Sequence, residues 1–205
     1  MSKTHTYRTL EAASKSYFKE KGSKFYGFAF PVVDEEEVKL CLEELKQIHP
    51  GAGHHCYGYR LGIGNEERYR ANDDGEPSNS AGKPIYGQLL SAEITNVLVV
   101  VVRYFGGTKL GVGGLISAYK LGAKLAIDSG KIVKKTEENY YQIEFDYLVM
   151  SEVMNFVKRQ NLTVLSQEFQ EICVIKFSVS IPKSELLVSE LEKIEGVDVE
   201  FIEKS

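Results

Sequence analysis

The chain has 205 residues, which is enough for one large or two small domains with a proper hydrophobic core. Its 43% apolar and 26% charged residues are those of an ordinary globular protein, and a net charge of −4 gives no global attraction for nucleic acid. Three cysteines without metal-ligand spacing exclude a disulfide framework. The polar N-terminus and the short apolar runs predict a cytoplasmic protein that spans no membrane.

The first part of the chain predicts alternating strands and helices. After a polar N-terminus, Lys24–Val33 is predicted to form a strand, with phenylalanines supplying its bulk. Asp34 and Glu37 have the spacing of a capping box, so a helix should follow them. His54–Leu61 then alternates between its two faces, which predicts a second strand, and Arg68–Arg70 begins the return strand.

The next loop places three carboxylates within four positions: Asp73, Asp74 and Glu76. Oxygen ligands this close together suit a divalent metal ion, and neighbouring carboxylates can shift each other's pKa enough for acid–base work. The alternative is turn chemistry, in which an aspartate accepts local amides. A helix is predicted to follow, and Lys83 in its first turn can either pair with the acidic loop or contact a ligand.

His54-His55-Cys56 precede this loop on the predicted strand. His54 and Cys56 share a face, which can orient a histidine–cysteine pair, but adjacent side chains on opposite faces do not make a metal site by themselves. No signal beyond His54 would activate the Cys56 thiol. We therefore expect His54 or His55 to hydrogen-bond the loop that begins at Asp73, and we assign no catalytic residue, metal or cofactor.

Val97–Val102 is an unbroken and mostly β-branched apolar run, which predicts a strand buried on both faces. From Leu115 onward, apolar residues recur at three- and four-residue steps, which predicts a helix. Five glycines lie between the strand and the helix: Gly106, Gly107, Gly111, Gly113 and Gly114. The unit is therefore buried strand, glycine loop, helix.

This glycine loop has two possible roles. Exposed amides beside a helix N-terminus suit a phosphate or carboxylate, and Arg103 and Lys109 would add positive charge. Alternatively, the glycines only permit a tight turn and close packing of the helix on the sheet. The established phosphate motifs are absent, since Ile116 stands where the third glycine of a dinucleotide fingerprint would be. The loop by itself names no ligand.

The C-terminal part predicts a separate domain. Ile132–Glu138 is expected to be the last strand of a first domain spanning 1–138, and residues 139–205 then follow the order βαββαβ, which is that of the ferredoxin-like fold. The first domain holds 19 basic and 17 acidic residues, and the second holds 6 and 12. The acidic second domain therefore masks a mildly basic first domain.

Two blocks, GEPSNSAGKP (Gly75–Pro84) and NVLVVVVRYFGGTKLGVGGLISAY (Asn96–Tyr119), together with His54-His55-Cys56, closely resemble the IMPACT/YigZ family from about Lys24 to Ala126. The resemblance implies an α+β protein of two domains. Its first domain would be a two-layer α/β domain like those of a ribosomal protein and elongation factors, with a left-handed βαβ crossover. The second, as in bacterial members, would resemble a C-terminal domain of elongation factor G. One departure is Asn79-Ser80, where glycine-threonine is usual; asparagine tolerates left-handed backbone angles.

The sequence and the resemblance support two hypotheses. The first is a non-enzymatic protein that binds RNA or the ribosome and regulates translation, with Arg103, Lys109, the loop amides and Lys24 or Arg70 contacting the nucleic-acid backbone. The second is a small-molecule phosphate-binding protein or enzyme, in which the loop holds the anion and the acidic cluster with His54 or His55 supplies metal or acid–base chemistry. A broad basic face favours the first, and a cleft shared by both blocks favours the second. No oligomeric state is predicted.

Overall fold

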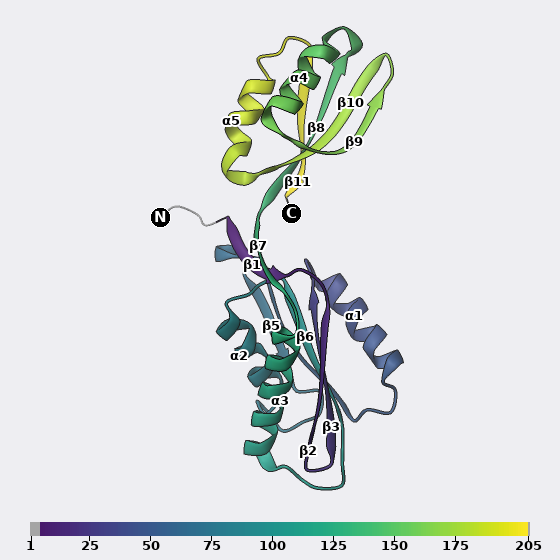
Figure 1. The fold of residues 1–205 in the computed structure, drawn as a ribbon, viewed down its shortest axis with the longest axis vertical. Coiled ribbons are helices and arrows are strands. Elements are labelled where there is room, and N and C mark those ends of the chain that lie inside the picture. Colours follow the sequence, from purple (N-terminus) through teal and green to yellow (C-terminus); the bar gives the residue numbers. More distant parts are fainter. Residues whose placement is uncertain (1–4, 205) are drawn as a thin grey trace. The chain divides into compact units, whose positions relative to one another are not determined.

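A computed structural model describes residues 5–204 and shows an α+β fold in two domains (Figure 1). Residues 1–4 and residue 205 lie outside the described residues. Residues 1–4 are part of the polar N-terminus on which the prediction of a cytoplasmic protein is based. The chain divides into two compact units, Met1–Lys135 and Thr136–Ser205, which we call unit 1 and unit 2. Across the described residues, none of the helices combines the length and the apolar character needed to span a membrane.

Unit 1 is built on a five-stranded antiparallel sheet with the order β2-β3-β6-β4-β5, and β1 pairs with β7 in a separate two-stranded sheet. Its elements are β1 (Thr6–Leu10), β2 (Ser14–Glu20), β3 (Ser23–Pro31), α1 (Glu35–Ile48), β4 (His54–Leu61), a 3-10 turn (Gly64–Glu66), β5 (Arg68–Asn72), α2 (Gly82–Ala92), β6 (Val97–Tyr104), α3 (Gly111–Asp128) and β7 (Ile132–Thr136). The sequence did not predict β1 and β2, and the strand expected over 132–138 ends at Thr136.

The apolar run of β6 forms the centre of this sheet and is buried on both faces, as its composition predicts. Val97, Val99 and Val101 pack with apolar side chains of α2 and α3. Leu98, Val100 and Val102 pack on the other face with Val38 and Leu45 of α1. Because successive residues of a strand point to opposite faces, α1 covers one face of the sheet, whereas α2 and α3 cover the other (Figure 1).

This arrangement contains a crossover of unusual hand. The connection from β3 through α1 to β4 and the connection from β5 through α2 to β6 each join parallel strands and skip one strand between them. The first connection moves across the sheet toward β5, and the second moves back toward β2. The strands β3 and β4 also run antiparallel to β5 and β6. Because both the step and the strand direction are reversed, the two crossovers would have the same hand if α1 and α2 lay on the same face of the sheet. Since α1 and α2 lie on opposite faces, one crossover is left-handed, against the usual rule.

Unit 2 has the expected βαββαβ order and an antiparallel sheet with the order β11-β8-β10-β9. Its main elements are β8 (Glu138–Asp146), a 3-10 turn (Tyr147–Val149), α4 (Met150–Gln160), β9 (Thr163–Phe169), β10 (Ile172–Ser180), α5 (Ile181–Leu191) and β11 (Val197–Lys204). Alternate residues of β8, including Ile143 and Phe145, pack with Val153 of α4 and Leu191 of α5 in a core of their own. Both helices therefore cover one face of this sheet.

Candidate functional site

The acidic loop folds back on the helix that follows it. One carboxylate oxygen of Asp73 accepts hydrogen bonds from the amides of Ala81 (3.0 Å) and Gly82 (2.8 Å), and the other accepts from the amide of Asn79 (2.8 Å). The N-cap residue of α2, Ala81, supplies no side-chain cap, so Asp73 satisfies these amides in its place. Asn79 has φ of 61°, a left-handed conformation that asparagine tolerates better than most residues.

Strand β4 holds the loop through three successive residues. The Nδ1 atom of His54 lies 2.8 Å from the carbonyl oxygen of Asp74, so it carries the proton and donates. The amide of His55 donates to the Asp74 carboxylate (2.6 Å), and the Cys56 thiol donates to the carbonyl oxygen of Asp73 (2.9 Å). Polar contacts to the loop therefore account for His54-His55-Cys56.

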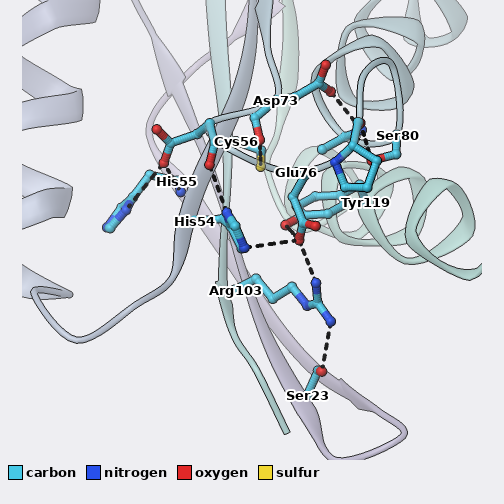
Figure 2. Close-up of polar contacts among 12 residues, drawn as sticks. Ser23, His54, His55, Cys56, Asp73, Glu76, Ser80, Arg103 and Tyr119 are labelled. Atoms are coloured by element: carbon cyan, nitrogen blue, oxygen red, sulfur yellow. Dashed lines mark hydrogen bonds and ion pairs between the residues drawn. The ribbon is translucent and has the colours of Figure 1, made fainter. Parts of the chain in front are cut away.

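Glu76, the third carboxylate, points into the protein and joins the loop to β6 and α3 (Figure 2). Its Oε1 atom lies 2.6 Å from Nη1 of Arg103, 2.7 Å from the Tyr119 hydroxyl and 3.7 Å from Nε2 of His54. Arg103 also donates to the Ser23 hydroxyl (3.3 Å). Only 4% of the Glu76 side chain and 6% of the Arg103 side chain are exposed. The structure thus places Arg103 in a buried ion pair, not on a surface that could receive an anion.

Burial also controls the titratable groups around this pair. It raises the pKa of the Cys56 thiol and of the Tyr119 hydroxyl far above their ordinary values, so both stay protonated at neutral pH. A reactive thiol needs a lowered pKa, and Cys56 is therefore unsuited to act as a nucleophile. Burial lowers the pKa of His55, although the neighbouring Asp74 acts in the opposite direction.

The glycines after β6 have different roles. Gly106 donates its amide to the Ser23 hydroxyl (3.2 Å), and a Cβ atom at Gly106 would lie 1.8 Å from the carbonyl carbon of Gly22. This glycine therefore lets the loop lie against the turn between β2 and β3. Gly107 and Gly111 have φ of 86° and 71°. Gly113 and Gly114 lie inside the first turns of α3 instead, and neither has a positive φ.

The loop and the neighbouring hairpin turn gather four exposed lysines, which we call the tip cluster: Lys19, Lys21, Lys24 and Lys109. Lys19 and Lys24 stand directly opposite each other on β2 and β3. Lys21 precedes Gly22, which contacts Gly106, and Lys109 lies in the same loop as Gly106. Figure 1 shows the β2–β3 turn beside the connection from β6 to α3. Within residues 5–204, none of the four forms an ion pair.

The N-terminus of α3, which follows this loop, has no side-chain cap and no acidic residue in its first turn. Its first amides therefore lack side-chain acceptors, and the positive end of its dipole adds to the charge of Lys109. Exposed Phe105 lies at the start of the same loop, with the Arg103 guanidinium 5.7 Å from its ring centre. These groups give the tip cluster a net positive charge and one exposed aromatic ring, although exposed Glu20 lies between Lys19 and Lys21.

The structure brings together only some residues of the two groups that the sequence predicted, the glycine loop with Arg103 and the acidic cluster with its neighbours. The glycine loop and the acidic cluster meet through the contact of Arg103 with Glu76, whereas Lys83 is exposed on α2 and has no ion pair with the acidic loop within the described chain. Over residues 5–204, no three His, Cys, Asp or Glu side chains are arranged to hold a metal ion. The sequence did not predict that Ser23 and Tyr119 belong to this site. For Tyr119 a signal was present, because a tyrosine on the inward face of a helix needs a hydrogen-bond partner for its hydroxyl group.

Comparisons with known proteins agree with this architecture. The model of the Impact N-terminal domain matches residues 21–127. An IMPACT family member of Haemophilus influenzae is 32% identical over 86% of this chain and 86% of its own length, and IMPACT family member YigZ of Escherichia coli is 28% identical over 80% of each. A crystal structure described as that of an hypothetical protein has a TM-score of 0.72, covers 98% of both chains at 24% identity, and so shares the fold. The chain belongs to the IMPACT/YigZ family.

Proposed function

We propose that the protein is a non-enzymatic RNA-binding protein that contacts the phosphodiester backbone through the tip cluster. The observation that carries this proposal is that four exposed lysines, which form no ion pair among the described residues, lie at the β2–β3 turn and in the loop before the uncapped N-terminus of α3. Lys19 and Lys24 point to the face of the sheet that α1 covers, and Lys109 lies in the loop that leads to α3 on the other face. Lysines and backbone amides at a helix N-terminus are the groups that contact phosphates without reading sequence. The proposal includes ribosomal RNA, which presents the same phosphodiester backbone. Binding to ribosomal RNA is the route by which the protein would regulate translation.

The pairing of Lys19 with Lys24 supports a role in binding rather than in stability. Two like charges directly opposite each other on neighbouring strands repel, at a cost of about 0.2–1 kcal/mol. Stability alone would favour a residue of opposite charge at one of these positions. A polyanion between the two ammonium groups would remove the repulsion, so the pair is better suited to the bound state.

The state of the acidic cluster also favours binding over catalysis. Asp73 accepts three backbone amides, and the Asp74 carboxylate accepts the amide of His55. Glu76 is buried against Arg103 and Tyr119. Asp73 and Glu76 are engaged in holding the loop and are not positioned to exchange protons with a substrate, whereas the Asp74 side chain is 40% exposed and uses one carboxylate oxygen for the His55 amide. We therefore assign Asp73 and Glu76 no catalytic role in the alternative function, a phosphate-using enzyme.

The test is RNA binding by the full chain over a series of salt concentrations, measured by fluorescence anisotropy of labelled RNA. The triple variant Lys19→Ala, Lys24→Ala, Lys109→Ala should bind more weakly. If the three lysines each neutralise one phosphate of a single strand, the slope of log K against log salt should also fall by about 2.

A triple variant with the same change in net charge, Lys176→Ala, Lys183→Ala, Lys193→Ala in unit 2, is the matched control, because these lysines are also exposed. It should bind like the wild type. Equal affinity of the two triple variants, or RNA binding by the wild type without any salt dependence, would refute the tip cluster as the RNA contact.

A further inference from the structure

One face of the β2–β3 hairpin carries aromatic rings interleaved with lysines. Directly opposite residues share a face, and the register pairs Lys15 with Phe28, Tyr17 with Tyr26, and Lys19 with Lys24. Phe30 follows two residues after Phe28, so it lies on the same face. We call this set the aromatic face: Lys15, Tyr17, Lys19, Lys24, Tyr26, Phe28 and Phe30. It contains no acidic residue, because Glu20 of the hairpin points to the opposite face.

The aromatic face is only partly covered by α1. The buried side chains of α1, Val38 and Leu45, pack over β4 and β6, whereas β2 is the edge strand on the far side of β3. Tyr26, Phe28 and Phe30 are half-buried against this core, and His49 at the end of α1 also contacts the hairpin: its ring lies 5.1 Å from that of Tyr26 and 5.6 Å from that of Phe28. Tyr17 remains 48% exposed.

The rings on this face form two pairs, and the His49 ring contacts Tyr26 of one pair and Phe28 of the other. The ring of Tyr17 lies 4.8 Å from that of Tyr26, and the rings of Phe28 and Phe30 stack with an interplanar angle of 11°. Lys15 and Lys19 flank Tyr17 at steps of two residues, which places the ammonium groups roughly 13 Å apart along the strand if their stems extend alike. That length suits two or three stacked bases with phosphates on either side.

We propose that the aromatic face is a stacking platform for single-stranded RNA, with bases on Tyr17 and its neighbours and phosphates on Lys15, Lys19 and Lys24. This inference rests on the proposed RNA-binding function and specifies its substrate as an unpaired strand. Every base has a π-face, so such a platform tolerates many sequences. The bases of a duplex are stacked on one another and cannot reach these rings.

Two features favour RNA over a protein partner. Lysines are depleted in the cores of protein–protein interfaces, whereas here they alternate with the rings. The face is also continuous with the tip cluster, because Lys19 and Lys24 belong to both. A strand that contacts the phosphate-binding loop can therefore continue along β2 without leaving positively charged surface.

The test compares a short labelled oligouridylate, which is unstructured, with a mixed-sequence RNA duplex. Tyr17→Ala should weaken binding of the oligouridylate by about 5- to 150-fold, which is the range expected for loss of one stacked base. Its affinity for the duplex should change by less than about two-fold, because the duplex contacts only lysines. Tyr17→Phe keeps the ring and should bind both RNAs like the wild type. Tyr147→Ala in unit 2 is the matched control, since Tyr147 is 60% exposed.

The outcomes separate this inference from the proposed function. If Tyr17→Ala binds oligouridylate like the wild type, while the triple lysine variant of the tip cluster loses affinity for both RNAs, the platform is refuted and the RNA-binding function stands. If the wild type binds neither RNA, both are refuted. A wild-type dimer that Tyr17→Ala converts to a monomer without loss of oligouridylate binding would show that the face mediates self-association, which also overturns the platform.

Discussion

Replacing Arg103 with methionine should destabilise unit 1 strongly. Arg103→Met keeps an apolar stem against Phe25 but removes the charge that faces Glu76. The Glu76 carboxylate, whose side chain is 4% exposed, would retain the Tyr119 hydroxyl at 2.7 Å and His54 at 3.7 Å. Removing one partner of a buried ion pair typically costs about 3–5 kcal/mol, because the other charge stays desolvated without compensation. We expect a loss in that range.

The second half of this experiment removes the remaining charge. Glu76→Gln still presents an oxygen that accepts from Tyr119, so the double variant Arg103→Met, Glu76→Gln should be more stable than the sum of the single losses predicts, by about 1–3 kcal/mol. Hydrogen exchange of the β6 amides in the full chain gives the free energy of opening of unit 1. Amides of unit 2 are an internal reference, which avoids treating two units as a single transition.

The reasoning fails if Arg103→Met costs less than about 1 kcal/mol and the two single losses simply add, since a buried pair must show coupling. If the variant kept its stability but lost RNA affinity, Arg103 would be an external anion contact, as one interpretation of the sequence proposed. The matched variant Lys83→Met, at an exposed position, should leave the exchange rates of β6 unchanged.

Three further predictions follow from burial and backbone geometry. Gly106→Ala should destabilise the protein in a thermal melt, because its Cβ would lie 1.8 Å from the carbonyl carbon of Gly22. Gly113→Ala lies inside α3 with open space around its Cβ, so it should stabilise the protein by about 0.5–1 kcal/mol. A more stable Gly106→Ala than Gly113→Ala would contradict this loop geometry. Cys56, which is fully buried and has a raised pKa, should resist alkylation in the native protein and react only after denaturation, so rapid labelling under native conditions would exclude this burial. Burial lowers the pKa of His55 below its ordinary value of 6.5, so as the pH falls the unfolded chain takes up a proton at this histidine before the folded chain does. The contribution of His55 to the free energy of unfolding should therefore be fully present above pH 6.5 and decrease as the pH drops below it. Urea titrations at several pH values should show that His55→Gln reduces this pH dependence.

The elements with strong periodicity could be predicted from the sequence. The valine run of β6, the helical steps after Leu115 and the βαββαβ order of unit 2 all appear in the structure. β2 was missed because it is an edge strand whose sequence, Ser14–Glu20, is mostly polar and carries lysines, as exposed edges often do. The hand of the crossovers depends on which face each helix covers, and no local pattern records that.

The site was predicted less completely than the fold. Asp73, Asp74 and Glu76 look equivalent in the sequence, yet one caps α2, one binds β4 and one is buried against Arg103. These differences arise from the path of the loop across β4 and α3, which is a long-range property. Likewise, Gly113 looks like part of the glycine loop but belongs to α3, because the helix begins at Gly111.

The position of β6 has a consequence for synthesis of the chain. β6 is the last strand of its sheet to be made, yet it lies between β3 and β4, so the two halves of the sheet cannot join until it emerges from the ribosome. Pro31 and Tyr104, which end β3 and β6, are 73 positions apart, and at about 5–20 residues per second translation takes roughly 4–15 s to cover that interval. During this time the inner edges of β3 and β4 have no partner strand, and both are rich in aromatic residues. The nascent chain therefore passes through an aggregation-prone stage. Topology fixes the number of residues that this stage spans, and the translation rate sets its duration, so slower translation between these strands should lower the yield of folded protein.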